Sequence, residues 1–252
     1  MKSIIHILIC LITLSAFSQN DKRFEEGNDL YNQGDYTAAL EKYESILASG
    51  KHSSELYFNI ANAYYKLNHV APSIYYYEKA LLLDPNDKDI KNNIAFAKNM
   101  TLDAIDTIPE VGISKLIKRT TNSMSYDAWA KLAVAFVFLF VIMFIAYDFA
   151  YSTNKKRLTF LASNTALLFA IVALFFAFHK FQLDKSDQPA IVFAQESKIQ
   201  SEPNFRSSEA FVLHEGTKVQ VLDTVDVWKK IKLSDGKTGW ILADDIKMLK
   251  KF

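Results

Sequence analysis

The residue types that most often carry catalysis are scattered along this chain. The histidines beyond the first twenty residues are His52, His69, His179 and His214. None has a histidine partner at i, i+4 or the carboxylate companion of a zinc site, and Glu215 beside His214 is explained as a polar turn. Nucleophile elbows, phosphate-binding glycine loops and paired acid–base carboxylates do not occur either. The sequence therefore predicts no catalytic residue, no metal, no cofactor and no enzyme.

Amide and aromatic side chains instead recur at a fixed spacing in the N-terminal half. Residues 34 apart match: Phe24 with Phe58, Leu40 with Ile74, Tyr43 with Tyr77, and Asn59 with Asn93, while small residues recur at Gly27, Ala61 and Ala95. A period of 34 residues is that of tetratricopeptide repeats, in which pairs of helices stack. Side chains that recur in this way can line a surface for binding a protein segment.

The elements that position these side chains are predicted as two repeat units, residues 20–53 and 54–87, followed by a capping helix over 88–100. Together they form a tetratricopeptide domain of residues 20–100. Two units are close to the smallest stable stack, so we expect the array to lean on another surface. Candidates are the segment 113–123, the membrane face and another protein.

Tetratricopeptide arrays bind peptides in a concave groove lined by the first helix of each unit. The resemblance implies that the groove residues here are Phe24, Asn28, Tyr31, Phe58, Asn62 and Tyr65. Asn28 and Asn59 match two positions of the carboxylate clamp of chaperone-binding members, but Phe24, Asp89 and Asn93 stand where the clamp has cations. The resemblance thus favours an apolar or aromatic-rich segment as ligand. In the alternative interpretation, Asn59 and Asn93 bond neighbouring backbone and the aromatic residues only pack.

Two apolar runs in the middle of the chain are each long enough to cross a bilayer as a helix. They predict membrane spans over residues 128–149 and 158–179, joined by a basic cytoplasmic turn over 150–157. Two crossings return the chain to its starting side. In the second span, Asn164 is expected either to contact a membrane helix of another subunit or to bond its own backbone or the interface.

The first residues resemble a secretory signal peptide over residues 1–18: Lys2, an apolar stretch, and small residues ahead of Gln19. We therefore expect both soluble parts to face the periplasm from a bacterial inner membrane. Alternatively, the leader is not inserted and both face the cytoplasm. The only cysteine, Cys10, lies within the leader, so we expect neither a disulfide nor a cysteine-based metal site.

The linker over residues 101–127 contains apolar residues and cations at helical spacing. Ile113, Leu116 and Ile117 alternate with lysine and arginine, as in a helix on a membrane surface. A solvated linker with a few apolar residues is the alternative.

After residue 188 the pattern changes to short alternating strands separated by turns. Strands are predicted over residues 190–192, 210–213, 218–222, 228–233 and 239–241, with turns at Gly216 and at Asp235-Gly236. A small all-β barrel over residues 188–249 is implied, and the order of its turns and tryptophans resembles a bacterial SH3 domain. Members of that family bind cell-wall peptides or proteins, or act as spacers. Trp228 and Trp240 are expected to pack the barrel or to contact a ligand.

The whole chain is thus predicted to be a multi-domain membrane protein: an all-α tetratricopeptide array, a two-helix transmembrane hairpin and an SH3-like barrel. Its net charge of +1 gives no footprint for nucleic acid. This order of parts resembles the E-type proteins of the bacterial aerotolerance (Bat) operon. The resemblance implies a scaffold working beside von Willebrand factor A-domain membrane proteins and a MoxR-type AAA ATPase, in aerotolerance or envelope stress. The alternative is a membrane-tethered module that binds peptidoglycan through the barrel.

Overall fold

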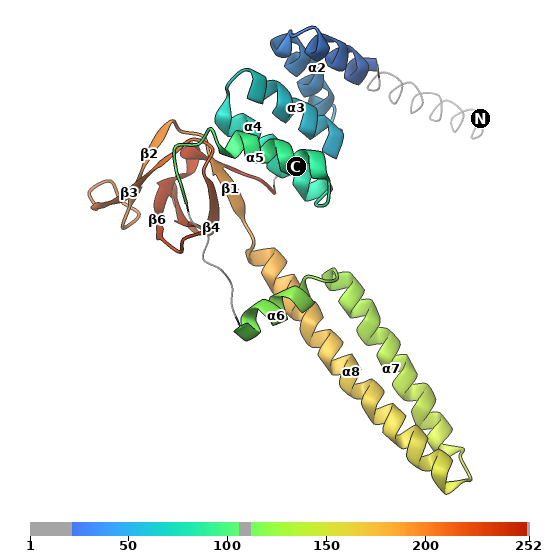
Figure 1. The fold of residues 1–252 in the computed structure, drawn as a ribbon. Coiled ribbons are helices and arrows are strands. Elements are labelled where there is room, and N and C mark those ends of the chain that lie inside the picture. The colour runs from blue at the N-terminus through green and yellow to red at the C-terminus, as the bar shows by residue number, and fades with distance from the viewer. Residues whose placement is uncertain (1–21, 106–111, 251–252) are drawn as a thin grey trace, which may run out of the picture. The chain divides into compact units, whose positions relative to one another are not determined.

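The computed structural model describes residues 22–105 and 112–250, and the predicted signal peptide lies outside them. The described residues fall into two compact units (Figure 1). One unit combines the N-terminal helices with the C-terminal strands, and the other holds the helices between them. The predicted fold class is confirmed: a helical array, two long apolar helices and an antiparallel sheet follow one another along the chain.

The array begins with a helix over residues 22–32 and continues through α2 (Tyr36–Ala48), α3 (Ser54–Lys66), α4 (Val70–Leu83) and α5 (Lys88–Lys98). The starts of α2 and α3 are capped by side chains: Asp35 accepts from Ala38 N at 3.1 Å, and Ser53 Oγ accepts from Leu56 N at 3.1 Å. The chain turns between the first helix and α2 at Gly34, which adopts a φ of +86°.

Small residues let the helices of the array approach closely, as their recurrence in the sequence suggests. A Cβ on Gly27 would lie 2.5 Å from Cε1 of Tyr43, so no larger residue fits there without displacing that ring. Ala61 is fully buried. Ala95, at the same place of the repeat, is exposed because α5 is the last helix of the array.

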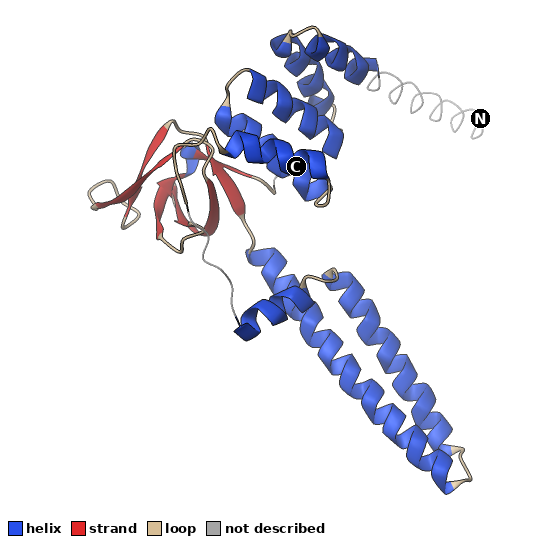
Figure 2. Cartoon of the chain, in the orientation of Figure 1, coloured by secondary structure: helices blue, strands red, loops and turns tan. Residues whose placement is uncertain are grey.

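Residues 189–248 form an antiparallel sheet with the strand order β3-β2-β6-β5-β4-β1-β7 (Figure 2). The strands are β1 (Pro189–Val192), β2 (Glu196–Gln200), β3 (Glu209–His214), β4 (Lys218–Val225), β5 (Trp228–Lys232), β6 (Thr238–Leu242) and β7 (Ile246–Met248). Their inward side chains, such as Ile199, Ile231 and Ile241, form a buried apolar core. Two of these strands, β2 and β7, were not predicted. β2 has few β-forming residues and β7 is three residues long, so neither gives a strong alternating pattern.

The second unit contains α6 (Gly112–Thr121), α7 (Tyr126–Asp148) and α8 (Thr153–Ser186). α7 and α8 pack against each other through small residues of α8, and most of their large apolar side chains are exposed. Among the described helices, α7 and α8 are long and apolar enough to cross a membrane, which is compatible with a membrane hairpin. The predicted basic turn is shorter than expected, because α8 begins at Thr153 and already contains Lys155, Lys156 and Arg157.

Candidate functional site: repeat groove and domain interface

A side-chain hydrogen-bond group joins the first and second repeat units. Asn28 Oδ1 accepts from Tyr43 Oη at 2.8 Å and from Asn59 Nδ2 at 2.8 Å. Burial raises the pKa of Tyr43 to about 12, so its hydroxyl stays protonated and can donate at neutral pH. With both lone pairs of Oδ1 engaged, the capacity that Asn28 retains is the pair of N–H donors of its amide.

The same group recurs one repeat later. Asn62 Oδ1 accepts from Tyr77 Oη and, at 2.9 Å, from Asn93 Nδ2. Asn59 and Asn93 therefore donate to a side chain of the preceding helix pair, and the interpretation that they bond only neighbouring backbone was wrong. We call these two sets, Asn28-Tyr43-Asn59 and Asn62-Tyr77-Asn93, the amide ladder.

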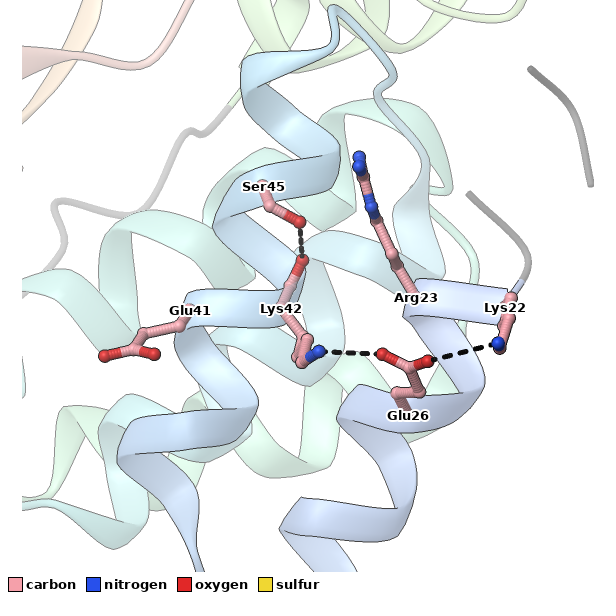
Figure 3. Close-up of a pocket in the computed structure, with 6 residues that line it drawn as sticks. All are labelled: Lys22, Arg23, Glu26, Glu41, Lys42 and Ser45. Atoms are coloured by element: carbon pink, nitrogen blue, oxygen red, sulfur yellow. Dashed lines mark hydrogen bonds and ion pairs between the residues drawn. The ribbon is translucent and has the colours of Figure 1, made fainter. Parts of the chain in front are cut away.

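A hollow with a volume of about 410 Å³, drawn in Figure 3, lies elsewhere on the array, between the first helix and α2. Lys42 Nζ lies 2.7 Å from Glu26 Oε2, and Lys22 Nζ lies 3.9 Å from Glu26 Oε1. Glu26 thus pairs with both lysines that line the hollow, at an exposed surface where ion pairs contribute little to stability. It carries no functional assignment.

Beside the first set of the ladder lies a hollow with a volume of about 290 Å³, lined by Asn28, Tyr31, Asn32, Tyr43 and Asn59. Two of the predicted groove residues, Asn28 and Tyr31, are therefore brought together at one cavity. Asn32 and Tyr43 also line it and were not predicted as groove residues. The 34-residue recurrence of Tyr43 was the signal that could have pointed to it.

The other predicted groove residues are half-buried and make contacts within the array. The Phe24 ring lies 5.9 Å from that of Tyr43, and the Phe58 ring lies 6.0 Å from that of Tyr77. Tyr65 packs against the buried apolar cluster that is centred on the second repeat unit. These aromatic residues thus have packing roles, whatever they contribute to a ligand.

The short array packs against the C-terminal sheet of its own chain. This surface was not among the predicted ones. Ile191 of β1 and Leu249 after β7 are buried in the same apolar cluster as Ile74 and Tyr77 of α4. The Tyr75 ring meets the Phe193 ring edge-on at 5.5 Å between centroids. The sheet therefore packs on α4, the second helix of the second repeat, and adds buried apolar surface to the short array.

A buried carboxylate links the two parts electrostatically. Glu78 of α4 is 7% exposed, and its oxygens lie 3.0 Å from Lys98 Nζ of α5 and 2.6 Å from Lys218 Nζ of β4. Burial raises the pKa of Glu78, but the attraction and hydrogen bonds of the two lysines outweigh burial, so the net pKa lies below the usual value. Glu78 is therefore ionised at neutral pH and holds the sheet to the array.

A second carboxylate, Asp103, anchors the segment after α5 to the sheet. It accepts from His214 N at 2.7 Å and from Thr217 Oγ1 at 2.6 Å, and it lies 2.7 Å from His214 Nδ1. Burial raises its pKa, yet the hydrogen bonds from Thr217 and His214 outweigh burial and leave the pKa below its usual range. His214 thus has a structural partner.

The two tryptophans of the sheet differ in accessibility. Trp228 is 4% exposed and is covered by Phe205, whose ring centroid lies 5.0 Å away. Trp240 is partly exposed, with Lys230 Nζ 5.9 Å from its ring centroid. Phe205 itself is 74% exposed, so the accessible aromatic surface next to Trp228 belongs to a residue that was not predicted.

Asn164 of α8 donates from Nδ2 to the carbonyl of Phe160 at 2.8 Å. This is the backbone bond that was one of its two expected roles. Within the part of the chain that the structure describes, no group of three or more His, Cys, Asp or Glu residues is arranged to hold a metal ion.

Comparison with known protein families agrees with this division. No curated protein matches the chain. Residues 54–87 match the tetratricopeptide repeat model, over the same range as the second predicted unit. Residues 198–247 match the bacterial SH3 domain model. The chain thus carries a tetratricopeptide repeat, which suggests protein binding, and a bacterial SH3 domain, which suggests cell-wall binding.

Proposed function

We propose that this protein is a membrane-anchored, non-enzymatic scaffold that holds a segment of a partner protein in its repeat groove. The observation that carries the proposal is the amide ladder beside the 290 Å³ hollow. The ladder fixes Asn28 and Asn62 through their carbonyl oxygens and leaves amide N–H groups to bond a ligand's carbonyl groups. Tyr31 and the neighbouring aromatic residues favour an apolar or aromatic-rich segment.

We place both soluble parts outside the cytoplasm, on the periplasmic side of a bacterial inner membrane. Docking of the array on the sheet supports an even number of crossings between them, because Glu78 and Lys218 can meet only in one compartment. The signal-like leader of residues 1–18 supports export. The turn between α7 and α8, residues 149–152, then faces the cytoplasm.

The more specific role that we propose is in a Bat-type aerotolerance or envelope-stress complex. The partners would be von Willebrand factor A-domain membrane proteins and a MoxR-type AAA ATPase. Support comes from the order of parts alone: leader, repeats, hairpin and SH3-like domain. Genes for such partners beside this one would strengthen the proposal, whereas neighbouring cell-wall hydrolase genes would favour the second candidate below.

Site-specific photo-crosslinking in native membranes tests the groove. A photoreactive amino acid at Asn32, which lines the hollow, should crosslink to a partner protein, and one at Glu41, exposed on α2 outside this hollow, should not. Tyr31→Ala should reduce the yield several-fold, while the same change at the fully exposed Tyr151 should leave it unaltered. Equal crosslinking from both positions would contradict groove binding.

A second candidate function, peptidoglycan binding, is favoured by the bacterial SH3 match and by the exposed Phe205 ring over Trp228. The full chain in detergent should then sediment with purified sacculi. Phe205→Ala should weaken this sedimentation, and Leu222→Ala, at another exposed apolar position of the sheet, should not. If the wild-type protein stays in the supernatant, this candidate is wrong.

A further inference from the structure

We infer that α6 is a membrane-surface helix that lies in one leaflet of the bilayer and binds anionic lipid headgroups. The inference rests on the hairpin spanning a bilayer, and it is independent of the groove and its ligand. It chooses between the two expectations for the linker, which were a surface helix and a solvated segment.

The two faces of α6 carry opposite chemistry. Ile113, Leu116 and Ile117 stand at i, i+3 and i+4 and therefore form one stripe of the helix. The cations Lys115, Lys118 and Arg119 have the same internal spacing, two residues later. A shift of two residues turns a helix by about 200°, so the cations lie on the side opposite the apolar stripe. This arrangement is typical of helices at a membrane interface.

Within the described residues most of this apolar stripe is exposed, although Ile117 is only 36% exposed. Ile113 is 77% exposed and Leu116 is 63% exposed, and within the described helix only Thr121, at its last position, is buried. A helix of 10 residues has marginal stability in water without packing of its apolar face. The exposed stripe therefore requires an apolar phase, and 10 residues are too few to span the roughly 20-residue hydrocarbon core.

Hydrogen bonds fix the end of α6 to the hairpin. Thr121 Oγ1 lies 2.9 Å from His179 Nδ1 of α8, and Thr121 O accepts from Trp129 Nε1 of α7 at 3.1 Å. Lys180 Nζ donates to Asn122 Oδ1 at 3.1 Å. Figure 1 shows α6 crossing α8 instead of running along it.

The point of attachment coincides with the edge of the apolar part of the hairpin. His179 and Lys180 are the first polar residues after the apolar run of α8, and Trp129 is an interfacial type of residue. A helix that leaves the hairpin here starts at headgroup depth. The bilayer that covers α7 and α8 then continues over the apolar stripe, and the cations face anionic headgroups. Continuity with the spans and the charge of the opposite face identify lipid as the occupant.

Spin-label accessibility in nanodiscs that hold one copy of the full chain tests this inference, with Cys10 replaced by serine. Labels at Ile113→Cys and Leu116→Cys should be accessible to oxygen and protected from a water-soluble nickel reagent, and a label at Lys115→Cys should show the reverse. Leu102→Cys, also 77% exposed but outside the hairpin unit, is the control for an exposed apolar position. If Ile113 and Leu116 give the water-accessible signal of Leu102, the inference is wrong.

Lipid charge provides the second readout. Replacing anionic lipid with zwitterionic lipid, or making the change Lys115→Gln, should shift the ratio of immersed to exposed label by about fivefold per lost cation contact. If the ratio does not change, the proposed headgroup contact is wrong. A label at Phe138→Cys on α7 separates this failure from failure of the anchor: if Phe138 is also water-accessible, the hairpin does not span the bilayer.

Discussion

Gly216 combines two requirements in one residue. It turns the chain before β4 with a φ of +85°, as the sequence predicted, and it also lies against the array. A Cβ there would come within 2.8 Å of Thr101 Cγ2 and 2.9 Å of Ile74 Cδ1. The turn was visible in the sequence, but the close approach was not, because the residues it meets are more than a hundred positions away.

Substituting Gly216 should therefore lower the unfolding free energy by more than backbone strain alone would. Gly34→Ala, at a φ of +86° with open space around it, should cost about 1 kcal/mol of unfolding free energy. Gly216→Ala should cost about 1–3 kcal/mol more, because it also forces the interface apart. Urea unfolding of the full chain in detergent, followed by circular dichroism, measures both. Equal losses would show that the array and the sheet do not touch at Gly216.

Glu78 provides a charge test of the same interface. Glu78→Gln keeps the shape and removes the charge that two lysines share, so the unfolding free energy should fall by about 2 kcal/mol. Lys42→Gln breaks the exposed pair with Glu26 and should change the unfolding free energy by less than about 1 kcal/mol. Tryptophan fluorescence during urea unfolding follows mainly the sheet, which holds Trp228 and Trp240, two of the three tryptophans of the chain. Similar effects of the two changes would argue against a buried pair.

At the scale of elements, local patterns predicted most of the fold. The 34-residue period predicted the helices because each repeat carries its own small and aromatic residues, as at Gly27 and Tyr43. Strands with clear alternation were predicted, and β2, with Ser197 at an inward position, was not. The repeated asparagines pointed to the groove, but their mutual bonding could not be predicted because it needs the stacked geometry. The interface between the array and the sheet was not predicted at all, because its partners, such as Asp103 and His214, are 111 residues apart in the sequence.

The segment after α5 and the strands β3 and β4 should separate in acid. The folded protein holds the pKa of Glu78 below its ordinary value of 4.5 and the pKa of Asp103 below its ordinary value of 3.8. Each ionised carboxylate therefore stabilises the folded state at pH values above its unfolded pKa. That contribution is complete at neutral pH, begins to fall as pH drops below 4.5, and is lost as pH passes through the folded pKa values. Unfolding midpoints of the full chain between pH 7 and pH 3 measure this loss. The double variant Glu78→Gln, Asp103→Asn should have a flatter profile, and an unchanged slope would assign the acid sensitivity to other groups.

At the scale of the whole molecule, the main feature is that one compact unit is built from both ends of the described chain. The array and the sheet belong to one compact unit, although the apolar helices α7 and α8 come between them in the sequence. If those helices span a bilayer, an even number of crossings is required for the unit to form. The sheet, which follows the two apolar helices in the sequence, thereby adds buried apolar surface to an array of two repeat units and a final helix.

Sidedness of labelling tests this arrangement directly. Single cysteines at Phe96 on α5 and at Phe205 in the sheet, both exposed, should react equally with a membrane-impermeant maleimide in intact cells whose outer membrane is permeabilised. A cysteine at Tyr151, in the turn between α7 and α8, should react only after the inner membrane is opened. Reaction of Phe96 and Phe205 from opposite sides would exclude both the hairpin and the docked unit. Reaction of both only after opening, with Tyr151 accessible from outside, would keep the hairpin and reverse its orientation, because the docking contacts need a shared compartment and do not specify which one.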